Sequence, residues 1–150
     1  MRTLIQRVSF ASVTIDGAIK SSIAKGLLIF AGIEENDNTE DIEWLAGKIC
    51  RLRIFDDSSG VMNLSVQDIN GGLMVISQFT LHASVKKGNR PSYIKAARPE
   101  IAIPVYENFL KILNKISGLQ VCSGEFGADM KINLENDGPV SIFIDTKLKE

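Results

Sequence analysis

The chain has 150 residues, of which 45% are hydrophobic and 23% are charged. Lys and Arg number 17 and Asp and Glu number 18, so the net charge is −1. This balance excludes a protein that is basic overall, such as a nucleic-acid clamp, but it leaves room for local basic patches. Length and composition predict one globular domain, residues 1–150, with a substantial core.

Cysteine and histidine are too few and too scattered for a metal site. Cys50 and Cys122 lie far apart in the sequence, and His82 is the only histidine. The acidic pair Asp56-Asp57 sits in a predicted turn and gives a metal site only weak support. We therefore expect no bound metal, and two reduced thiols of the kind found in cytosolic proteins.

The start of the chain has no apolar run typical of a signal peptide. "MRTLIQRVSFASVTI" alternates and carries charges, and no apolar stretch approaches the length that spans a membrane. We expect a cytoplasmic protein with no membrane partner.

The first third of the chain predicts three strands. "TLIQRVSFASVTI" alternates, Asp16-Gly17 is typical of a tight hairpin turn, and "AIKSSIA" returns as the second strand. "GLLIFAGI" (Gly26–Ile33) is a continuous apolar run, which favours a strand that is covered on both faces.

Two helices are predicted from capping and periodicity. The first runs from Thr39 to about Leu52, is capped by Asn38 or Thr39, and turns an apolar stripe inward. The second runs over residues 101–117 and ends at Gly118, with Pro104 expected in its first turn.

The other segments predict strands and loops. Asp57–Gly60 is expected to be the loop of a short hairpin, and "GGLMVISQFTLHA" a strand that ends near Ala83. Three strand-like pieces close the chain: "LQVCSG", "MKINLEN" and "PVSIFID". The order predicts an α+β fold, with a mixed or antiparallel sheet or a partly open barrel and two main helices.

Polar residues gather at the end of the strand expected to close near Ala83. On a strand, Gln78, Thr80 and His82 would share one face, which is typical of an ordinary polar sheet edge. The alternative is a catalytic threonine with His82 as its base. Side chains two residues apart on a strand stand about 6–7 Å apart, and no nearby carboxylate would orient the histidine, so a triad is weakly supported.

Three further segments each leave two interpretations open. "ENDGPVS" is an ordinary turn by composition, and a cis Gly138–Pro139 bond is a rarer alternative that composition alone does not favour. "KKGNRPSYIKAAR" carries five positive charges and no negative one, which suits either a solvated loop or a surface for phosphates. "GEFGADM" would bend and bring the backbone close to a ligand, but it is not a nucleotide-binding motif.

Taken together, these motifs resemble those of the D-aminoacyl-tRNA deacylases. That family carries a Ser-Gln-Phe-Thr-Leu motif, here Ser77–Leu81, and an Asn-x-Gly-Pro-x-Thr motif, here Asn136–Ser141. The likeness also includes "IQRVSFASVTIDG", "MNLS", "KGNRPSY" and "GEFGADM", and it extends over nearly the whole chain. The order and spacing of the pieces make the resemblance specific.

The resemblance implies an enzyme that hydrolyses the ester between tRNA and a D-amino acid, or glycine mischarged on tRNA-Ala. It implies a homodimer with active sites at the subunit interface, and no cofactor. Gly138–Pro139 would be a cis dipeptide inserted into the partner subunit's site, where its carbonyls hold the substrate's α-amino group. An L side chain would collide with this dipeptide, whereas a D side chain would point away.

The resemblance also implies roles for single residues. Backbone N–H groups at Phe79 and Thr80 would stabilise the oxyanion, and Gln78 would position the substrate. Thr80 is a candidate nucleophile, but assistance by the ribose 2′-hydroxyl is favoured because Thr80 has no convincing base. The implied catalytic set is Ser77, Gln78, Phe79 and Thr80; the substrate-binding set is Gly138, Pro139, Phe126 and Met130; and the set contacting the tRNA acceptor end is Lys86, Lys87 and Arg90.

The sequence departs from the family pattern at two positions. Ser141 stands where threonine is usual, and His82 where tyrosine is expected more often. Two other classes of function remain as alternatives. One is a nucleic-acid-binding module without catalysis, and the other is a general serine or threonine esterase that would lose activity in Thr80→Ala.

Overall fold

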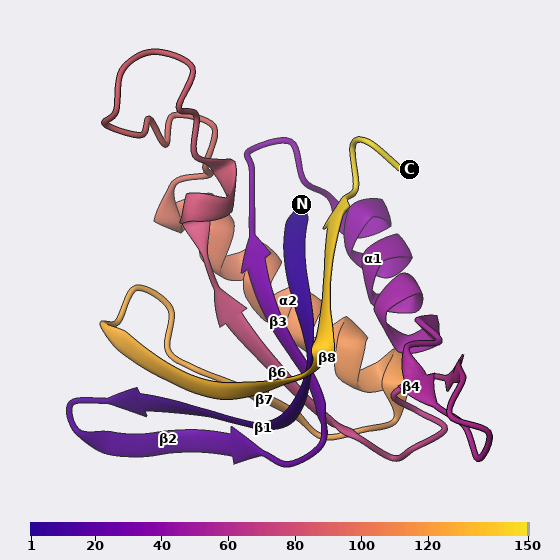
Figure 1. Ribbon diagram of the computed structural model, residues 1–150. Coiled ribbons are helices and arrows are strands. Elements are labelled where there is room, and N and C mark those ends of the chain that lie inside the picture. Colours follow the sequence, from indigo (N-terminus) through magenta and orange to yellow (C-terminus); the bar gives the residue numbers. More distant parts are fainter. Residues whose placement is uncertain (150) are drawn as a thin grey trace.

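The computed structural model describes residues 1–149. Eight strands, two α-helices and a short 3-10 helix follow one another along the chain (Figure 1). Their bounds are β1 Arg2–Ile15, β2 Ala18–Ile23, β3 Gly26–Gly32, α1 Thr39–Arg51, β4 Phe55–Asp56, β5 Met62–Leu64, β6 Gly72–Ser77, η1 Phe79–His82, α2 Pro99–Ser117, β7 Val121–Ser123 and β8 Met130–Asp145.

Six strands form one mixed sheet, in the order β2-β1-β3-β6-β7, with β8 pairing along β1. The β1 pairs are antiparallel, whereas β3–β6 and β6–β7 are parallel. The sheet curls until its two ends meet, and the Ser21 hydroxyl on β2 donates to the Ser123 carbonyl on β7 over 2.9 Å. The result is a nearly closed barrel with a mixed sheet, which confirms the predicted α+β class and the partly open barrel.

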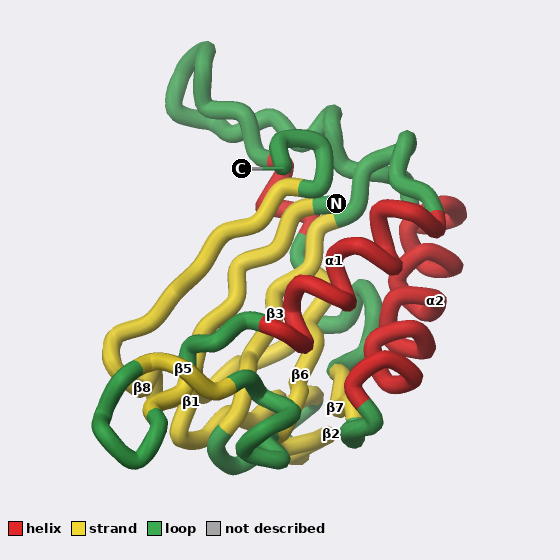
Figure 2. Tube along the Cα trace, turned by 90° about the vertical axis from the view of Figure 1, so that its right-hand side faces the viewer, coloured by secondary structure: helices red, strands yellow, loops and turns green. Residues whose placement is uncertain are grey.

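Both α-helices lie on one side of the strands (Figure 2). A large apolar cluster fills the space between the helices and the sheet, with Ile29, Leu45 and Phe109 among its fully buried side chains. A smaller cluster around Val13, Leu28 and Met74 fills the curl of the sheet. Within residues 1–149, no helix has the length and apolarity needed to cross a membrane.

Local signals in the sequence correctly located several turns and caps. Asp16 and Gly17 form the β1–β2 turn, both with positive φ. The Asn38 side chain accepts from the Asp41 N–H while the Asp41 carboxylate accepts from the Asn38 N–H, so a reciprocal box opens α1. Gly118 ends α2 in the left-handed conformation, as predicted.

The predicted strand through Ala83 is wrong beyond Ser77. The Gln78 N–H still bonds the Ala31 carbonyl over 2.8 Å, but β3 ends at Gly32, and within residues 1–149 no strand pairs with a longer β6. The chain turns into η1 instead, so Gln78, Thr80 and His82 do not share a strand face. His82 is also fully buried, which contradicts the interpretation as a polar sheet edge.

Two further boundaries differ from the prediction. The second helix begins at Pro99, so Pro104 lies inside it and Pro99 occupies the first turn. The last two strand-like pieces form one strand, β8, and the Asn136 side chain bridges the turn-like residues between them. Its amide accepts from the Val140 N–H over 2.9 Å and donates to the Val140 carbonyl over 3.1 Å.

Candidate active site

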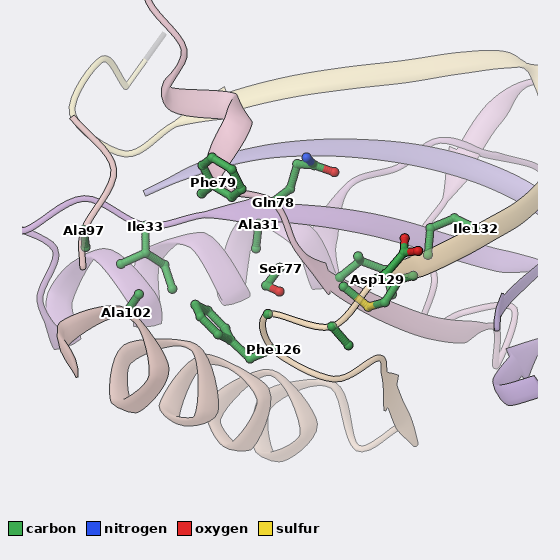
Figure 3. Close-up of a pocket in the computed structure, with 14 residues that line it drawn as sticks. Ala31, Ile33, Ser77, Gln78, Phe79, Ala97, Ala102, Phe126, Asp129 and Ile132 are labelled. Carbon is green, nitrogen blue, oxygen red and sulfur yellow. The ribbon is translucent and has the colours of Figure 1, made fainter. Parts of the chain in front are cut away.

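A cavity of about 320 Å³ opens where β6 ends, between η1, the start of α2 and the segment before β8 (Figure 3). Most of its wall is apolar, and its polar side chains are those of Ser77, Gln78 and Asp129. Its lining consists of Ala31, Ile33, Ile76, Ser77, Gln78, Phe79, Ala97, Ala102, Phe126, Gly127, Ala128, Asp129, Met130 and Ile132.

The turn from β6 into η1 forms one wall of this cavity. Ser77, Gln78 and Phe79 line it, while Thr80 does not. The Gln78 side-chain amide donates a hydrogen bond to the Thr80 hydroxyl. Within residues 1–149, the backbone N–H groups of Phe79 and Thr80 donate to no carbonyl outside η1, and the first N–H groups of a helix have no partner inside it. Two backbone donors are therefore free at the start of η1.

His82, the last residue of η1, packs its side chain into the core. It is fully buried, and neither ring nitrogen has a hydrogen-bond partner among the described residues. A Cβ atom on Gly32 would lie 3.0 Å from the imidazole Cδ2 and 2.9 Å from the Gln78 carbonyl oxygen. Glycine at position 32 therefore allows η1 to pack directly on β3, and His82 makes no hydrogen bond to Thr80.

Phe126 forms the opposite wall and is held by Tyr106 of α2. The two rings meet edge to face, with their centroids 5.8 Å apart. The buried Tyr106 hydroxyl donates to the Val75 carbonyl on β6 over 2.8 Å, and burial raises the pKa of this phenol well above its usual range. Tyr106 therefore stays a neutral donor that ties Phe126 to the strand leading into Ser77.

Met130 lines the cavity next to a glycine that gives it space. A Cβ atom on Gly124 would overlap the Met130 sulfur, so only glycine leaves the thioether in its present position. At the rim, the exposed Asp129 carboxylate pairs with Lys131 at 2.8 Å. Exposed pairs of this kind contribute little to stability.

Gly138 and Pro139 do not line the cavity of their own chain. Both are exposed, on the part of β8 that faces Arg7, and the peptide bond between them is cis. The structure therefore separates the two motifs that the resemblance links: the Ser77–Leu81 motif lies at the cavity, and the Gly-Pro motif lies elsewhere on the same chain.

The basic segment after η1 is a loop that projects from the body of the protein (Figure 1). Its two ends meet at Ser84 and Ser92, which exchange backbone hydrogen bonds of 2.8 and 2.9 Å. Lys86, Lys87 and Arg90 lie between these serines, are exposed and do not line the cavity.

Sequence reasoning missed much of the cavity wall. Gly127, Ala128 and Asp129 lie inside "GEFGADM", so that motif was the available signal for them. Ala97, just before α2, and Ala102, in its first turns, carry no local signal, because small residues around the start of a helix are common. The described residues contain no cluster of His, Cys, Asp or Glu that would hold a metal ion.

Comparison with known proteins identifies the family. The family described as D-Tyr-tRNA(Tyr) deacylase matches residues 4–145. The D-aminoacyl-tRNA deacylase of Bacteroides fragilis (strain YCH46) is 66% identical over 150 residues, which cover all of both chains. The protein of that name from Flavobacterium johnsoniae is 61% identical, again over the full length of both chains.

Solved structures share the fold. One named c-Myc DNA Unwinding Element Binding Protein has 38% identity and a TM-score of 0.91, and the match covers 97% of this chain and 98% of that one. A probable eukaryotic D-amino acid tRNA deacylase has 14% identity and a TM-score of 0.81 over 95% and 97% of the two chains, so it shows the fold alone. On the full-length identities and the family match, this chain belongs to the D-Tyr-tRNA(Tyr) deacylase family.

Proposed function

We propose that this protein hydrolyses the ester bond of D-aminoacyl-tRNA and releases free D-amino acid and tRNA. The observation that carries the proposal is the position of Ser77, Gln78 and Phe79 on the wall of the cavity at the end of β6, in a chain that belongs to this family. The mostly apolar cavity suits an amino-acid side chain and a nucleoside, with few polar groups to orient them.

The backbone of η1 would stabilise the transition state. Attack on the ester carbonyl places negative charge on its oxygen, and the free N–H groups of Phe79 and Thr80 are the donors available at this wall. Gln78 would fix the substrate beside them. Water would attack the carbonyl carbon with the help of the neighbouring ribose 2′-hydroxyl, the bond to the ribose ester oxygen would break, and that oxygen would take up the proton that the water gives up. Thr80 lacks a base, and its hydroxyl already accepts a hydrogen bond from Gln78.

Chiral selection would need a second copy of the chain. Gly138 and Pro139 are exposed and lie outside their own cavity, which supports a homodimer in which they complete the partner's site. Their carbonyls would hold the substrate's α-amino group and leave no room for an L side chain. Glycine has no side chain to collide, so glycyl-tRNA mischarged on tRNA-Ala would also be accepted.

The tRNA would be held by a small part of the surface. Lys86, Lys87 and Arg90 sit on the projecting loop beside the cavity motif, and phosphates of the acceptor end are their natural partners. The net charge of −1 fits contact with this end alone better than a wrap around the whole molecule.

Subunit mixing tests the shared site. One variant, Ala128→Trp, fills the cavity and keeps the Gly-Pro segment; the other deletes Gly138 and Pro139 and keeps the cavity. We expect each alone to lose D-tyrosyl-tRNA hydrolysis. Co-expression should restore about one quarter of the wild-type sites, because random pairing makes half the dimers mixed and each mixed dimer has one intact site. No recovery in a proven mixed dimer would contradict a site built from two subunits.

A second candidate function is nucleic-acid binding without catalysis. The 38% identical structure carries the name of a DNA-unwinding-element binding protein, which favours this alternative over a general esterase. It predicts strong, salt-dependent binding of duplex DNA. The balanced charge of the present chain argues against it, and hydrolysis of D-tyrosyl-tRNA by the purified protein would exclude it.

A further inference from the structure

Phe79 and Tyr93 form an aromatic pair between the cavity and the basic loop. Their ring centroids are 5.0 Å apart and their planes meet at 76°, an edge-to-face arrangement. Phe79 lines the cavity, whereas Tyr93 follows directly after Ser92, which closes the projecting loop. We propose that this pair is a stacking site for the unpaired base that precedes the terminal adenosine of the tRNA. The proposal rests on the proposed function and extends it.

Both rings are open to a ligand. Phe79 is 57% and Tyr93 is 39% exposed, which is high for aromatic side chains that touch each other. An edge-to-face pair uses the edge of one ring and one face of the other, so ring faces remain available. Unpaired bases of RNA are held by stacking on such faces.

Tyr93 is held in place although it belongs to a loop. The Ser84–Ser92 bridge precedes it, and its carbonyl accepts from the Ala96 N–H over 2.9 Å. The Ala97 N–H then donates to the Ile33 carbonyl over 2.8 Å, which attaches the end of the loop to the edge of the cavity. These contacts fix the backbone that carries the ring, so less of the loop has to become ordered when a base stacks on it.

Positive charge flanks Tyr93 on both sides in the sequence. Lys86, Lys87 and Arg90 precede Tyr93 in the loop, Lys95 and Arg98 follow it, and no acidic residue lies between Ser84 and Arg98. A strand whose terminal adenosine enters the cavity would pass Phe79, then Tyr93, and then these cations. Aromatic rings beside a basic track are the combination that binds single-stranded nucleic acid.

The test compares two substrates that differ only in the upstream nucleotides. D-tyrosyl-tRNA contains the base in question, and D-tyrosyl-adenosine lacks it. Tyr93→Ala should raise the KM for D-tyrosyl-tRNA about fivefold or more, as expected for loss of one stacked base. It should leave kcat and the KM for D-tyrosyl-adenosine unchanged. Tyr93→Phe should restore the wild-type KM, and Ile94→Ala, at a neighbour that is 90% exposed, should have no effect.

Two results would overturn the proposal. One is an unchanged KM for D-tyrosyl-tRNA in Tyr93→Ala. The other is an equal rise in KM for both substrates, since that would make Tyr93 only a support for Phe79.

A binding measurement separates this proposal from the proposed function. A CCA trinucleotide with 2-aminopurine as its middle base should lose fluorescence when it binds the wild-type protein, but not with Tyr93→Ala. Quenching without any hydrolysis by wild type would support the stacking site and contradict the deacylase function. Normal hydrolysis without quenching would support the deacylase function and contradict the stacking site.

Discussion

The Arg7 guanidinium donates a hydrogen bond from Nε to the carbonyl oxygen of Asp137, over 2.8 Å. The same group donates to the Ile54 carbonyl over 2.6 Å, and its side chain is only 7% exposed. Asp137 directly precedes Gly138 and Pro139, so one buried side chain on β1 holds the start of the Gly-Pro segment against the β4 region.

Replacing Arg7 tests this link. In Arg7→Lys the charge remains, but a single ammonium cannot serve two carbonyls in the directions that the guanidinium does. We expect a loss of about 1–3 kcal/mol of unfolding free energy, since a buried carbonyl is left unpaired. We also expect weaker rejection of L-tyrosyl-tRNA. Urea unfolding and the D-to-L ratio of kcat/KM measure the two effects.

Arg53→Lys is the matched control for Arg7→Lys, because Arg53 also donates from Nε to a carbonyl, that of Asn63, but at an exposed position. It should change neither stability nor selectivity. An Arg7→Lys protein with the stability and selectivity of wild type would contradict the assigned role.

Gly32→Ala should displace η1, which carries the proposed oxyanion donors. The new Cβ would lie 2.9 Å from the Gln78 carbonyl oxygen and 3.1 Å from the Leu81 Cβ, so η1 must move away from β3. A shift of this kind lowers kcat about tenfold to a hundredfold. Gly47→Ala is the control, because its Cβ would meet only the flexible end of Arg51. Steady-state kinetics of both variants check the prediction, and equal kcat values would count against it.

Tyr106→Phe should separate stability from activity. The variant loses the hydrogen bond to the Val75 carbonyl, at a cost of about 1 kcal/mol, but keeps the ring that supports Phe126. We therefore expect a lower midpoint in urea with unchanged KM. Tyr106→Ala removes the ring as well and should raise KM in addition. If Tyr106→Phe raised KM as much as Tyr106→Ala, the hydroxyl would be the group that matters for the cavity.

The Asp145 carboxylate should make stability depend on pH. Burial would raise the pKa of Asp145, but hydrogen bonds from the Lys147 N–H and the Arg2 guanidinium, together with the charge of Arg2, bring it below its usual value. A pKa that is lower in the folded state stabilises the protein above the unfolded value of about 3.9. This contribution is lost as the pH falls through the folded pKa.

Asp145→Asn isolates that contribution. At pH 7 the variant should be less stable than wild type by about 1–2 kcal/mol, because the charged partner of Arg2 is gone. Urea unfolding from pH 7 down to pH 2.5 should show the difference between the two proteins shrinking below about pH 4. A difference that stays constant or widens toward acid would mean that this carboxylate is not stabilised in the fold.

Features set by neighbouring residues could be predicted from the sequence. Asn38 needs only Asp41 to open α1, and Asp16-Gly17 needs only its own backbone preferences to form a hairpin turn. The Ser77–Leu81 motif was identified by resemblance, but its shape was predicted wrongly. Alternation favoured a strand, and the turn into η1 depends instead on where β3 ends and on the space left by Gly32.

The composition of the site could be predicted less well than its motifs. Ala102 reaches the cavity because α2 packs beside β6, and Ala97 because its N–H donates to the Ile33 carbonyl. Both are tertiary contacts with no local pattern. The sequence also could not show that Gly138 and Pro139 lie outside the cavity of their own chain. Their position follows from the way β8 pairs along β1, which is known only from the fold.

The measurement that tests the central claim most directly is the release of amino acid from D-tyrosyl-tRNA and L-tyrosyl-tRNA, side by side, by wild type and Thr80→Ala. We predict rapid hydrolysis of the D ester alone, retained in Thr80→Ala because the backbone and the ribose hydroxyl carry the reaction. Loss of activity in Thr80→Ala would restore threonine as the nucleophile. If the wild-type protein hydrolysed neither ester faster than it hydrolyses spontaneously, the result would contradict the account.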